Sequence, residues 1–227
     1  MCIRDSNQTD PNSGKQGFSP EGVGNPVELL ERMQAMQYRT QIFGNAALTF
    51  HLMKGLDLKT QFGIDYHNNR DANYTPFTPR PMINQSSEGA ASANNSNSLY
   101  WQEETYLTYV KDINKHHINA MAGMSWQEYN YTKFEASDSK YIDDFYGYYN
   151  LGSGTNRPSV GNDYDKWAMN SYFLRFAYTY KDRYLLTATL RADGASNFAK
   201  NNRWGYFPSV ALGWRFTEEN FARSLNL

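Results

Sequence analysis

The sequence has one cysteine, no long apolar run and almost no net charge, and each of these shortages excludes a class of protein. With Cys2 as its only cysteine, the chain has no internal disulfide framework. No stretch approaches about 20 consecutive apolar residues, and a mean hydropathy of −0.74 is too polar for transmembrane helices. A formal net charge of −1 gives no global field that would attract nucleic acid or anionic lipid. A membrane β-barrel is not excluded, because its strands expose only every second residue to lipid.

Aromatic residues are abundant: 18 tyrosines, 13 phenylalanines and 5 tryptophans make up 16% of the chain. Tyrosine and tryptophan combine an apolar ring with a polar tip, and they concentrate at membrane interfaces and on sugar-contacting surfaces. Composition alone fits an aromatic-rich soluble β-domain equally well.

From residue 38 onward, apolar and polar residues alternate along successive segments. In the clearest segment, Leu56, Phe62 and Ile64 share one face, while Asp57 and Lys59 lie on the other. Successive side chains in a strand point to opposite faces, so each segment is predicted to be a strand with one apolar face. The predicted strands are 38–52, 56–66, 99–111, 117–126, 171–180, 184–193 and 206–216.

The connections between these strands alternate between short and long. The short ones lie at 54–55, 112–115, 181–182 and 217–225, and the long ones at 67–98, 128–166 and 194–203. Outer-membrane barrels show this alternation, because short periplasmic turns and long extracellular loops join antiparallel neighbours. Greek-key sandwiches instead place long crossings at both ends. The predicted strands also exceed the ~5–6 residues typical of globular proteins and match the ~9–11 that a tilted membrane strand needs.

Aromatic residues gather at both ends of the predicted apolar faces, as in the two aromatic girdles of a membrane barrel. Those on the long-loop side are Tyr66, Trp101, Trp126, Tyr172 and Tyr206, and those on the short-turn side are Phe50, Tyr109, Tyr180, Tyr184, Trp214 and Phe216. We therefore expect an all-β fold for residues 38–227, a partial transmembrane antiparallel β-barrel of about seven strands with long extracellular loops. Residues 7–37 are expected to form an extracellular loop. Residues 1–6 are not a signal peptide, because no apolar stretch follows them. They look like the spurious leader of a reading frame translated from assembled fragments and are interpreted as a translation or assembly artefact.

Residues 171–221 carry the most specific sequence pattern. Tyr184-Leu185-Leu186 is followed by Arg191-Ala192-Asp193-Gly194-Ala195-Ser196-Asn197-Phe198, and then by Gly205-Tyr206-Phe207-Pro208-Ser209. These motifs resemble a hairpin and strand signature of SusC/RagA-like TonB-dependent outer-membrane transporters. The resemblance is looser over 25–126 and fades within 128–166.

The resemblance implies a plugged barrel of about 22 strands, of which residues 38–227 would be an incomplete, internal part. It also implies import of oligosaccharides or peptides across the outer membrane of a Gram-negative bacterium, with no enzymatic activity and no cofactor. The implied partners are the lipid bilayer, a surface lipoprotein lid and TonB, the last two through parts of the protein outside these residues.

The long connection after residue 128 contains the best candidates for substrate contacts. Tyrosine rings stack on sugar faces, Asp and Asn side chains bond to hydroxyl groups, and exposed loops commonly carry binding residues. A self-packed loop, or a contact with the lid lipoprotein, explains the same residues equally well. The candidate substrate-binding residues are Asp143, Asp144, Tyr146, Tyr148, Tyr149 and Asn150.

No catalytic or metal-binding constellation emerges from the sequence. The 4 histidines show no metal-like spacing with other ligands. Asp143 and Asp144 lack the accompanying Gly and Glu of an EF-hand calcium loop. Glu103 and Glu104 are adjacent in a predicted strand, so they face opposite sides and cannot form a glycosidase pair.

Charged residues on the predicted polar faces are expected to pair with one another or with a plug rather than to line a substrate path. They are Asp57, Lys59, Asp65, Arg175, Arg191, Asp193 and Arg215. Two other functions stay open at this point. One is a secreted, soluble all-β glycan-binding module; the other is a glycoside-acting β-enzyme, for which no carboxylate pair can be nominated.

Overall fold

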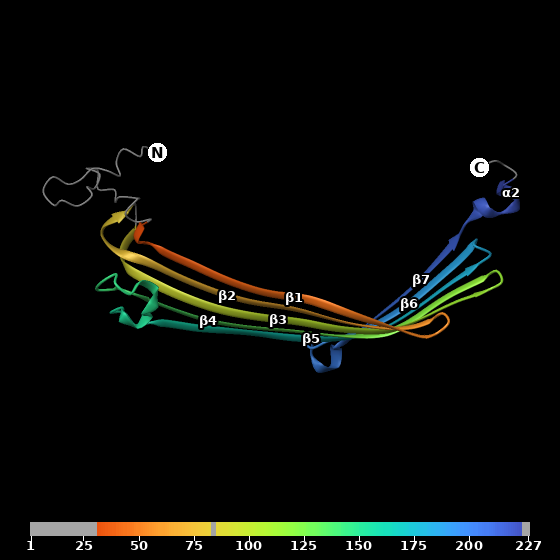
Figure 1. The fold of residues 1–227 in the computed structure, drawn as a ribbon, viewed down its shortest axis with the longest axis horizontal. Coiled ribbons are helices and arrows are strands. Elements are labelled where there is room, and N and C mark those ends of the chain that lie inside the picture. Colours follow the sequence, from red (N-terminus) through yellow and green to blue (C-terminus); the bar gives the residue numbers. More distant parts are fainter. Residues whose placement is uncertain (1–30, 83–84, 224–227) are drawn as a thin grey trace. The chain divides into compact units, whose positions relative to one another are not determined.

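The computed structural model describes residues 31–82 and 85–223, with the backbone alone at 77–82, 85–87, 220 and 223. In these residues seven strands form one sheet, and each strand lies beside the next one along the chain (Figure 1). The strands are β1 (Gln34–Met53), β2 (Leu56–Met82), β3 (Gln85–Ile113), β4 (His116–Ser139), β5 (Ser159–Tyr180), β6 (Tyr184–Ala195) and β7 (Trp204–Trp214). Because β1 and β7 are the two ends of this order, the sheet is open. The prediction of an all-β fold with seven antiparallel strands is confirmed.

Short elements occupy some of the connections. Between β4 and β5 lie two 3₁₀ turns, η2 (Gly147–Tyr149) and η3 (Leu151–Ser153), and η4 (Lys200–Asn202) precedes β7. After β7 the chain forms η5 (Phe216–Glu218) and α2 (Asn220–Arg223). No helix among the described residues has the length and apolar character needed to cross a membrane.

The three tight turns fall where the sequence predicts them. Gly55, between β1 and β2, has φ of 81°, and a Cβ there would lie 2.2 Å from the carbonyl oxygen of Val110. Only glycine tolerates both the positive φ and this close approach. Asn114 in the second turn has φ of 55°, and Lys181 and Asp182 in the third have φ of 52° and 55°. Such φ values match the twist of a two-residue hairpin turn.

The register at the C-terminal end keeps apolar side chains opposite one another. Leu186 of β6 pairs with Tyr178 of β5 and with Leu212 of β7, and Leu190 pairs with Leu174 and Pro208. Since the side-chain period in a strand is two, this register places the alternating apolar residues of three strands on one face.

Two of the predicted long connections are wrong in extent. Residues 67–98 are largely strand, because β2 continues to Met82 and β3 begins at Gln85; β4 likewise continues to Ser139 and β5 begins at Ser159. These extensions carry few large apolar residues, although β2 buries Ala72 and Tyr74 on one face, so alternation of apolar residues does not reveal them. Polar pairs link their side chains instead: Asp71 accepts hydrogen bonds from Gln37 (2.7 Å) and Asn94 (3.5 Å).

The N-terminal predictions fall mostly outside the described residues. Residues 1–30, which include the proposed artefact and most of the expected loop, lie there. The described part of 7–37 ends in strand, because β1 begins at Gln34.

The chain forms two compact units. Among the described residues, the first contains 31–41, 67–82, 85–98 and 131–164, and the second contains 42–66, 99–130 and 165–223. The first unit has a small core of Tyr74, Ala91 and Tyr141, in which the two tyrosine rings meet edge to face at 5.7 Å. Tyr148 and Leu151 pack against this core.

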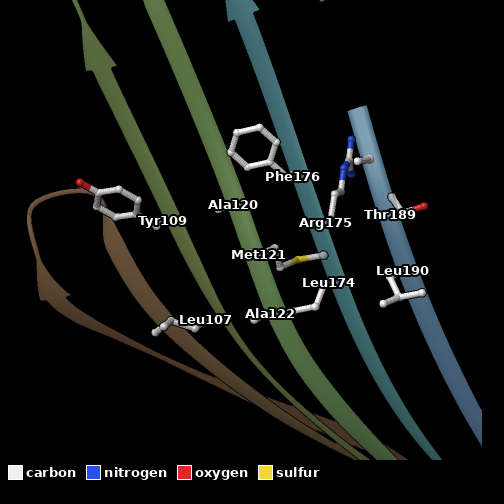
Figure 2. A pocket seen from close by; sticks show the side chains of 11 residues that line it. Leu107, Tyr109, Ala120, Met121, Ala122, Leu174, Arg175, Phe176, Thr189 and Leu190 are labelled. Atoms are coloured by element: carbon white, nitrogen blue, oxygen red, sulfur yellow. The ribbon is translucent and has the colours of Figure 1, made fainter. Parts of the chain in front are cut away.

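The second unit leaves a broad apolar surface uncovered. On one face of β5, β6 and β7, Leu174 is 54% exposed and Leu212 is 82% exposed, and Leu190, Val210 and Trp214 are exposed as well. A shallow depression of about 430 Å³ on β3 to β6 is bordered by apolar side chains that include Leu107, Tyr109, Leu174 and Leu190 (Figure 2). Contiguous apolar surface of this kind marks a membrane or partner contact.

The segment after β7 is tied back to the preceding turn through Glu219. Arg183 and the Tyr184 hydroxyl each donate to its carboxylate at 2.7 Å, and the Trp214 indole donates at 3.4 Å. This network agrees with the short turn that the sequence predicts at 217–225.

Candidate functional site

The connection between β4 and β5 is anchored at its base by the backbone. Lys140, with φ of 65°, donates its N–H to the Gly89 carbonyl at 2.9 Å and accepts from the Thr155 N–H at 3.1 Å. Tyr141 and Gly154 form an isolated antiparallel bridge. Residues 142–153 are therefore presented from a closed base, with η2 and η3 inside the loop.

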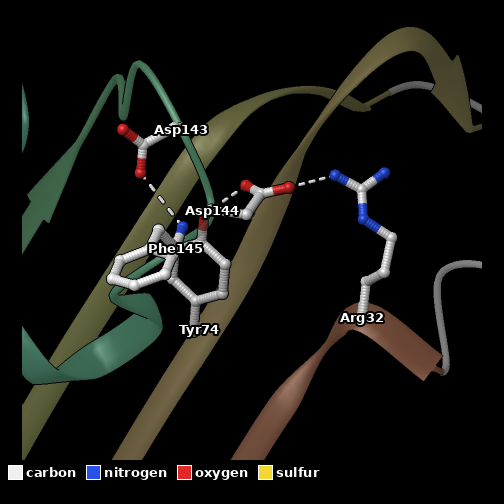
Figure 3. Close-up of polar contacts among 5 residues, drawn as sticks. All are labelled: Arg32, Tyr74, Asp143, Asp144 and Phe145. Carbon is white, nitrogen blue, oxygen red and sulfur yellow. Dashed lines mark hydrogen bonds and ion pairs between the residues drawn. The ribbon is translucent and has the colours of Figure 1, made fainter.

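Asp144 fastens the loop to two other segments (Figure 3). The hydroxyl of buried Tyr74 donates to its Oδ1, and the guanidinium of Arg32 pairs with its Oδ2. Burial, together with the Asp144 hydrogen bond, raises the pKa of Tyr74 well above its ordinary value. Asp144 is thus engaged in holding the loop to β2 and to the segment before β1.

Asp143 has a local role. Its Oδ1 accepts a hydrogen bond from the Phe145 N–H at 3.0 Å, which closes a small turn at the start of the loop (Figure 3). Side chains of Asp and Asn commonly fix turns in this way.

Two adjacent tyrosines link the loop core to its surface. The Tyr148 hydroxyl donates to the Tyr149 hydroxyl at 3.1 Å, and their ring centroids lie 4.4 Å apart. This hydrogen bond raises the pKa of Tyr148 to about 12. The Tyr148 ring packs on the small core, whereas Tyr149 is 75% exposed.

The surface of the loop carries more apolar area than the predicted residues account for. Phe145 is 84% exposed and packs edge to face against Tyr146 at 4.9 Å, and Ile142 is exposed beside them. Ile142 and Phe145 are not among the six predicted residues. Their signal was available, since apolar residues flank the Asp143-Asp144 pair in an otherwise polar connection.

The structure therefore places all six predicted residues in one loop but gives them different surroundings. Asp144 and Tyr148 hold the loop together, and Asp143 closes a turn. The Asn150 carbonyl accepts from Ser153, through its N–H at 3.3 Å and its hydroxyl at 2.9 Å. Tyr146 and Tyr149 face solvent. Substrate binding by these residues stays a prediction.

The other candidate groups take part in pairs. Among residues 31–82 and 85–223, no three His, Cys, Asp or Glu side chains are grouped so that they could hold a metal ion. His116 lies 2.6 Å from the Tyr178 hydroxyl and packs on the Tyr180 ring at 4.8 Å. Arg191 binds both oxygens of Asp193, at 2.7 and 2.9 Å. This pair fits the expectation that charges on the polar face neutralise one another.

A single open antiparallel sheet with one exposed apolar face, short turns and an ordered long loop is the geometry of a membrane-barrel wall. The sequence profile described as TonB dependent receptor-like, beta-barrel matches residues 4–225, and the chain belongs to this family.

Individual relatives also carry the name TonB-dependent receptor, and one of them is SusC. The chain is 32% identical over 191 residues to TonB-dependent receptor P39 of Formosa agariphila, covering 83% of the chain and 18% of that protein. It is 29% identical over 223 residues to TonB-dependent receptor SusC of Bacteroides thetaiotaomicron, covering 94% of the chain and 21% of SusC. The chain thus spans about a fifth of the length of these relatives, both of which are named TonB-dependent receptors.

Among solved structures, the RagAB peptide transporter is similar to the chain with a TM-score of 0.78 at 22% identity. The match covers 88% of this chain and 22% of that one, and at this identity it shows the fold alone. Together, these findings confirm the SusC/RagA-like resemblance. None of them supports the soluble glycan-binding module.

Proposed function

We propose that this chain forms part of the barrel wall of a TonB-dependent importer of oligosaccharides or peptides in the outer membrane of a Gram-negative bacterium. The observation that carries the proposal is the exposed apolar face of β5, β6 and β7 in a chain of the TonB-dependent receptor family. In this role the chain binds lipid on one face of the sheet and catalyses no reaction.

The energetics of the apolar face support a lipid contact. Leaving a leucine-sized side chain in water forfeits about 1.5–3 kcal/mol relative to burial. Leu174, Leu190 and Leu212 are all exposed on the same face. Hydrocarbon removes that cost, and the hydrogen-bonded strands leave few backbone polar groups unsatisfied within the sheet.

The proposed role as a TonB-dependent importer also implies partner proteins. A surface lipoprotein lid and TonB are the proposed partners, and both contacts involve parts of the receptor outside these residues. Similarity in fold to the RagAB peptide transporter makes peptides one proposed substrate class. The SusC/RagA-like motifs at 184–209 make oligosaccharides the other.

The loop between β4 and β5 is the proposed contact for substrate or lid. Tyr146 and Tyr149 offer exposed rings for stacking, and the Asp144 anchor to Tyr74 and Arg32 holds those rings in place. A loop that is ordered before binding loses less conformational freedom when a ligand arrives.

The function is tested by expressing the full-length receptor that carries this segment in a host lacking its own homologue. The expected result is receptor in the outer-membrane fraction and uptake of labelled oligosaccharides or peptides that is lost when TonB is deleted. Recovery of the receptor from the soluble periplasm, or uptake unaffected by TonB deletion, would contradict the proposal.

A further inference from the structure

A polar cavity of about 470 Å³ lies in the first unit, and none of the six predicted loop residues lines it. Its volume is within the ~300–1,000 Å³ range of small-molecule sites. Its walls come from β2, β3, β4 and the segment that leads into β5. Four segments far apart in the sequence build it, which is why no sequence motif reveals it.

The walls of the cavity consist mostly of hydroxyl and amide groups. Thr75, Ser92 and Ser139 contribute hydroxyls, and Asn156 and Arg157 contribute nitrogen donors. The Asn156 side chain donates to the Ser139 hydroxyl at 2.6 Å, which orients this part of the wall. Tyr74, adjacent in sequence to Thr75, belongs instead to the buried core.

Asp138 is the unusual member of the wall. It is 5% exposed; one carboxylate oxygen accepts from the Ser139 N–H at 2.7 Å, and the other has no hydrogen-bond partner among the described residues. Gly154 permits this arrangement, because a Cβ there would lie 2.5 Å from the Asp138 carboxylate carbon. A buried acceptor without a partner is destabilising, so a hydrogen-bond donor from a ligand would be bound favourably there.

We propose that this cavity binds a sugar unit of a neutral oligosaccharide, with the free oxygen of Asp138 accepting a hydrogen bond from a sugar hydroxyl. Each sugar hydroxyl both donates and accepts, which matches a wall of serine, threonine and asparagine side chains. The wall also contains Ala90 and Ala91, but most of its side chains are polar, and this favours a sugar over an apolar peptide side chain. The inference rests on the proposed importer function and deepens it by selecting oligosaccharides over peptides.

The test uses the purified full-length receptor in detergent, titrated calorimetrically with two panels of probes. One panel contains neutral gluco-, xylo- and manno-oligosaccharides, and the other contains tri- to pentapeptides. Asp138→Asn keeps the shape of the side chain but removes its charge, and it is expected to weaken oligosaccharide binding about tenfold or more. Ser92→Ala, which alters the wall without touching Asp138, is expected to weaken binding several-fold.

Asp163→Asn is the matched control. Asp163 lies in β5 of the same unit, is exposed, and accepts from the neighbouring Tyr164 N–H at 2.8 Å, so this variant should bind like the wild type. Unchanged oligosaccharide affinity in both folded cavity variants would overturn the inference, as would binding of peptides alone. In the latter case TonB-dependent peptide uptake would leave the importer function standing. Loss of TonB-dependent uptake of both panels would instead defeat the proposed function itself.

Discussion

Gly123 lies in the first half of β4, where aromatic side chains of both neighbouring strands converge on it. A Cβ at this position would lie 2.5 Å from Phe173 Cζ and 2.6 Å from Tyr106 Cβ, whereas ordinary contacts begin at 3.4 Å. Gly123 does not have a positive φ, so space rather than backbone conformation requires glycine. The Phe173 ring can shift, but Tyr106 Cβ moves only with its strand.

Gly123→Ala should therefore destabilise the receptor. Overpacking costs about 1–3 kcal/mol, while replacing a strand glycine with alanine returns about 0.5–1 kcal/mol. The expected net loss is about 1–2 kcal/mol in the free energy of unfolding. Gly63→Ala in β2 is the matched control, because a Cβ there meets only the flexible Gln102 side chain, at 3.3 Å. It should be neutral or slightly stabilising.

The assay is urea unfolding of the full-length receptor in lipid vesicles, followed by the gel-mobility difference between folded and unfolded barrels. The double variant Gly123→Ala with Phe173→Ala should recover part of the loss, because one of the two clashes disappears. If Gly123→Ala proved as stable as Gly63→Ala, the contact with Phe173 and Tyr106 would not constrain the strand, and the reasoning would be refuted.

Three further predictions concern the loop and the segment after β7. Asp144→Ala leaves the buried Tyr74 hydroxyl without its acceptor, so proteolytic cleavage within 140–158 should accelerate severalfold. Asp143→Ala loses only a local turn contact and should change the cleavage rate less. Equal cleavage rates for the two variants would argue against the Asp144 anchor. Tyr149→Ala removes an exposed ring and should weaken substrate or lid binding without changing the unfolding midpoint. A shifted unfolding midpoint with unchanged binding would show a structural role instead. The hydrogen bond from Tyr184 holds the pKa of Glu219 below its ordinary value of 4.5. The stabilising contribution of the Glu219 carboxylate is therefore present above pH 4.5 and lost as the pH falls through the lowered pKa. The difference in unfolding free energy between wild type and Glu219→Gln should then shrink on acidification. A difference that stays constant from pH 6 to pH 3 would contradict this linkage.

The strands with an exposed apolar face could be predicted from the sequence, because one apolar face gives a strand a side-chain period of two. An apolar residue at every second position of 184–190 and 210–214 signals both the strand and the face that it exposes. Turns were equally visible, since Lys54-Gly55 and Lys181-Asp182 interrupt that alternation at the required length.

The polar strand extensions could not be predicted in the same way. Where a strand carries few large apolar residues, its side-chain period is weak, and residues such as Asn68, Asn94 and Asn95 resemble a loop. Their strand pairing depends on neighbouring strands that a sequence pattern does not identify. The Asp144 anchor shares this difficulty, because its partners Tyr74 and Arg32 lie far away in sequence.

The central claim, that these strands form a lipid-facing barrel wall, is tested most directly by spin-label accessibility along β7. In the full-length receptor reconstituted in lipid, with its native cysteines replaced by serine, single labels at residues 209 to 213 would be compared for collision with oxygen and with a water-soluble nickel complex. Labels at Val210 and Leu212 should favour oxygen, and those at Ser209, Ala211 and Gly213 should favour nickel, in a period of two. Uniformly high nickel accessibility at all five positions would contradict the account.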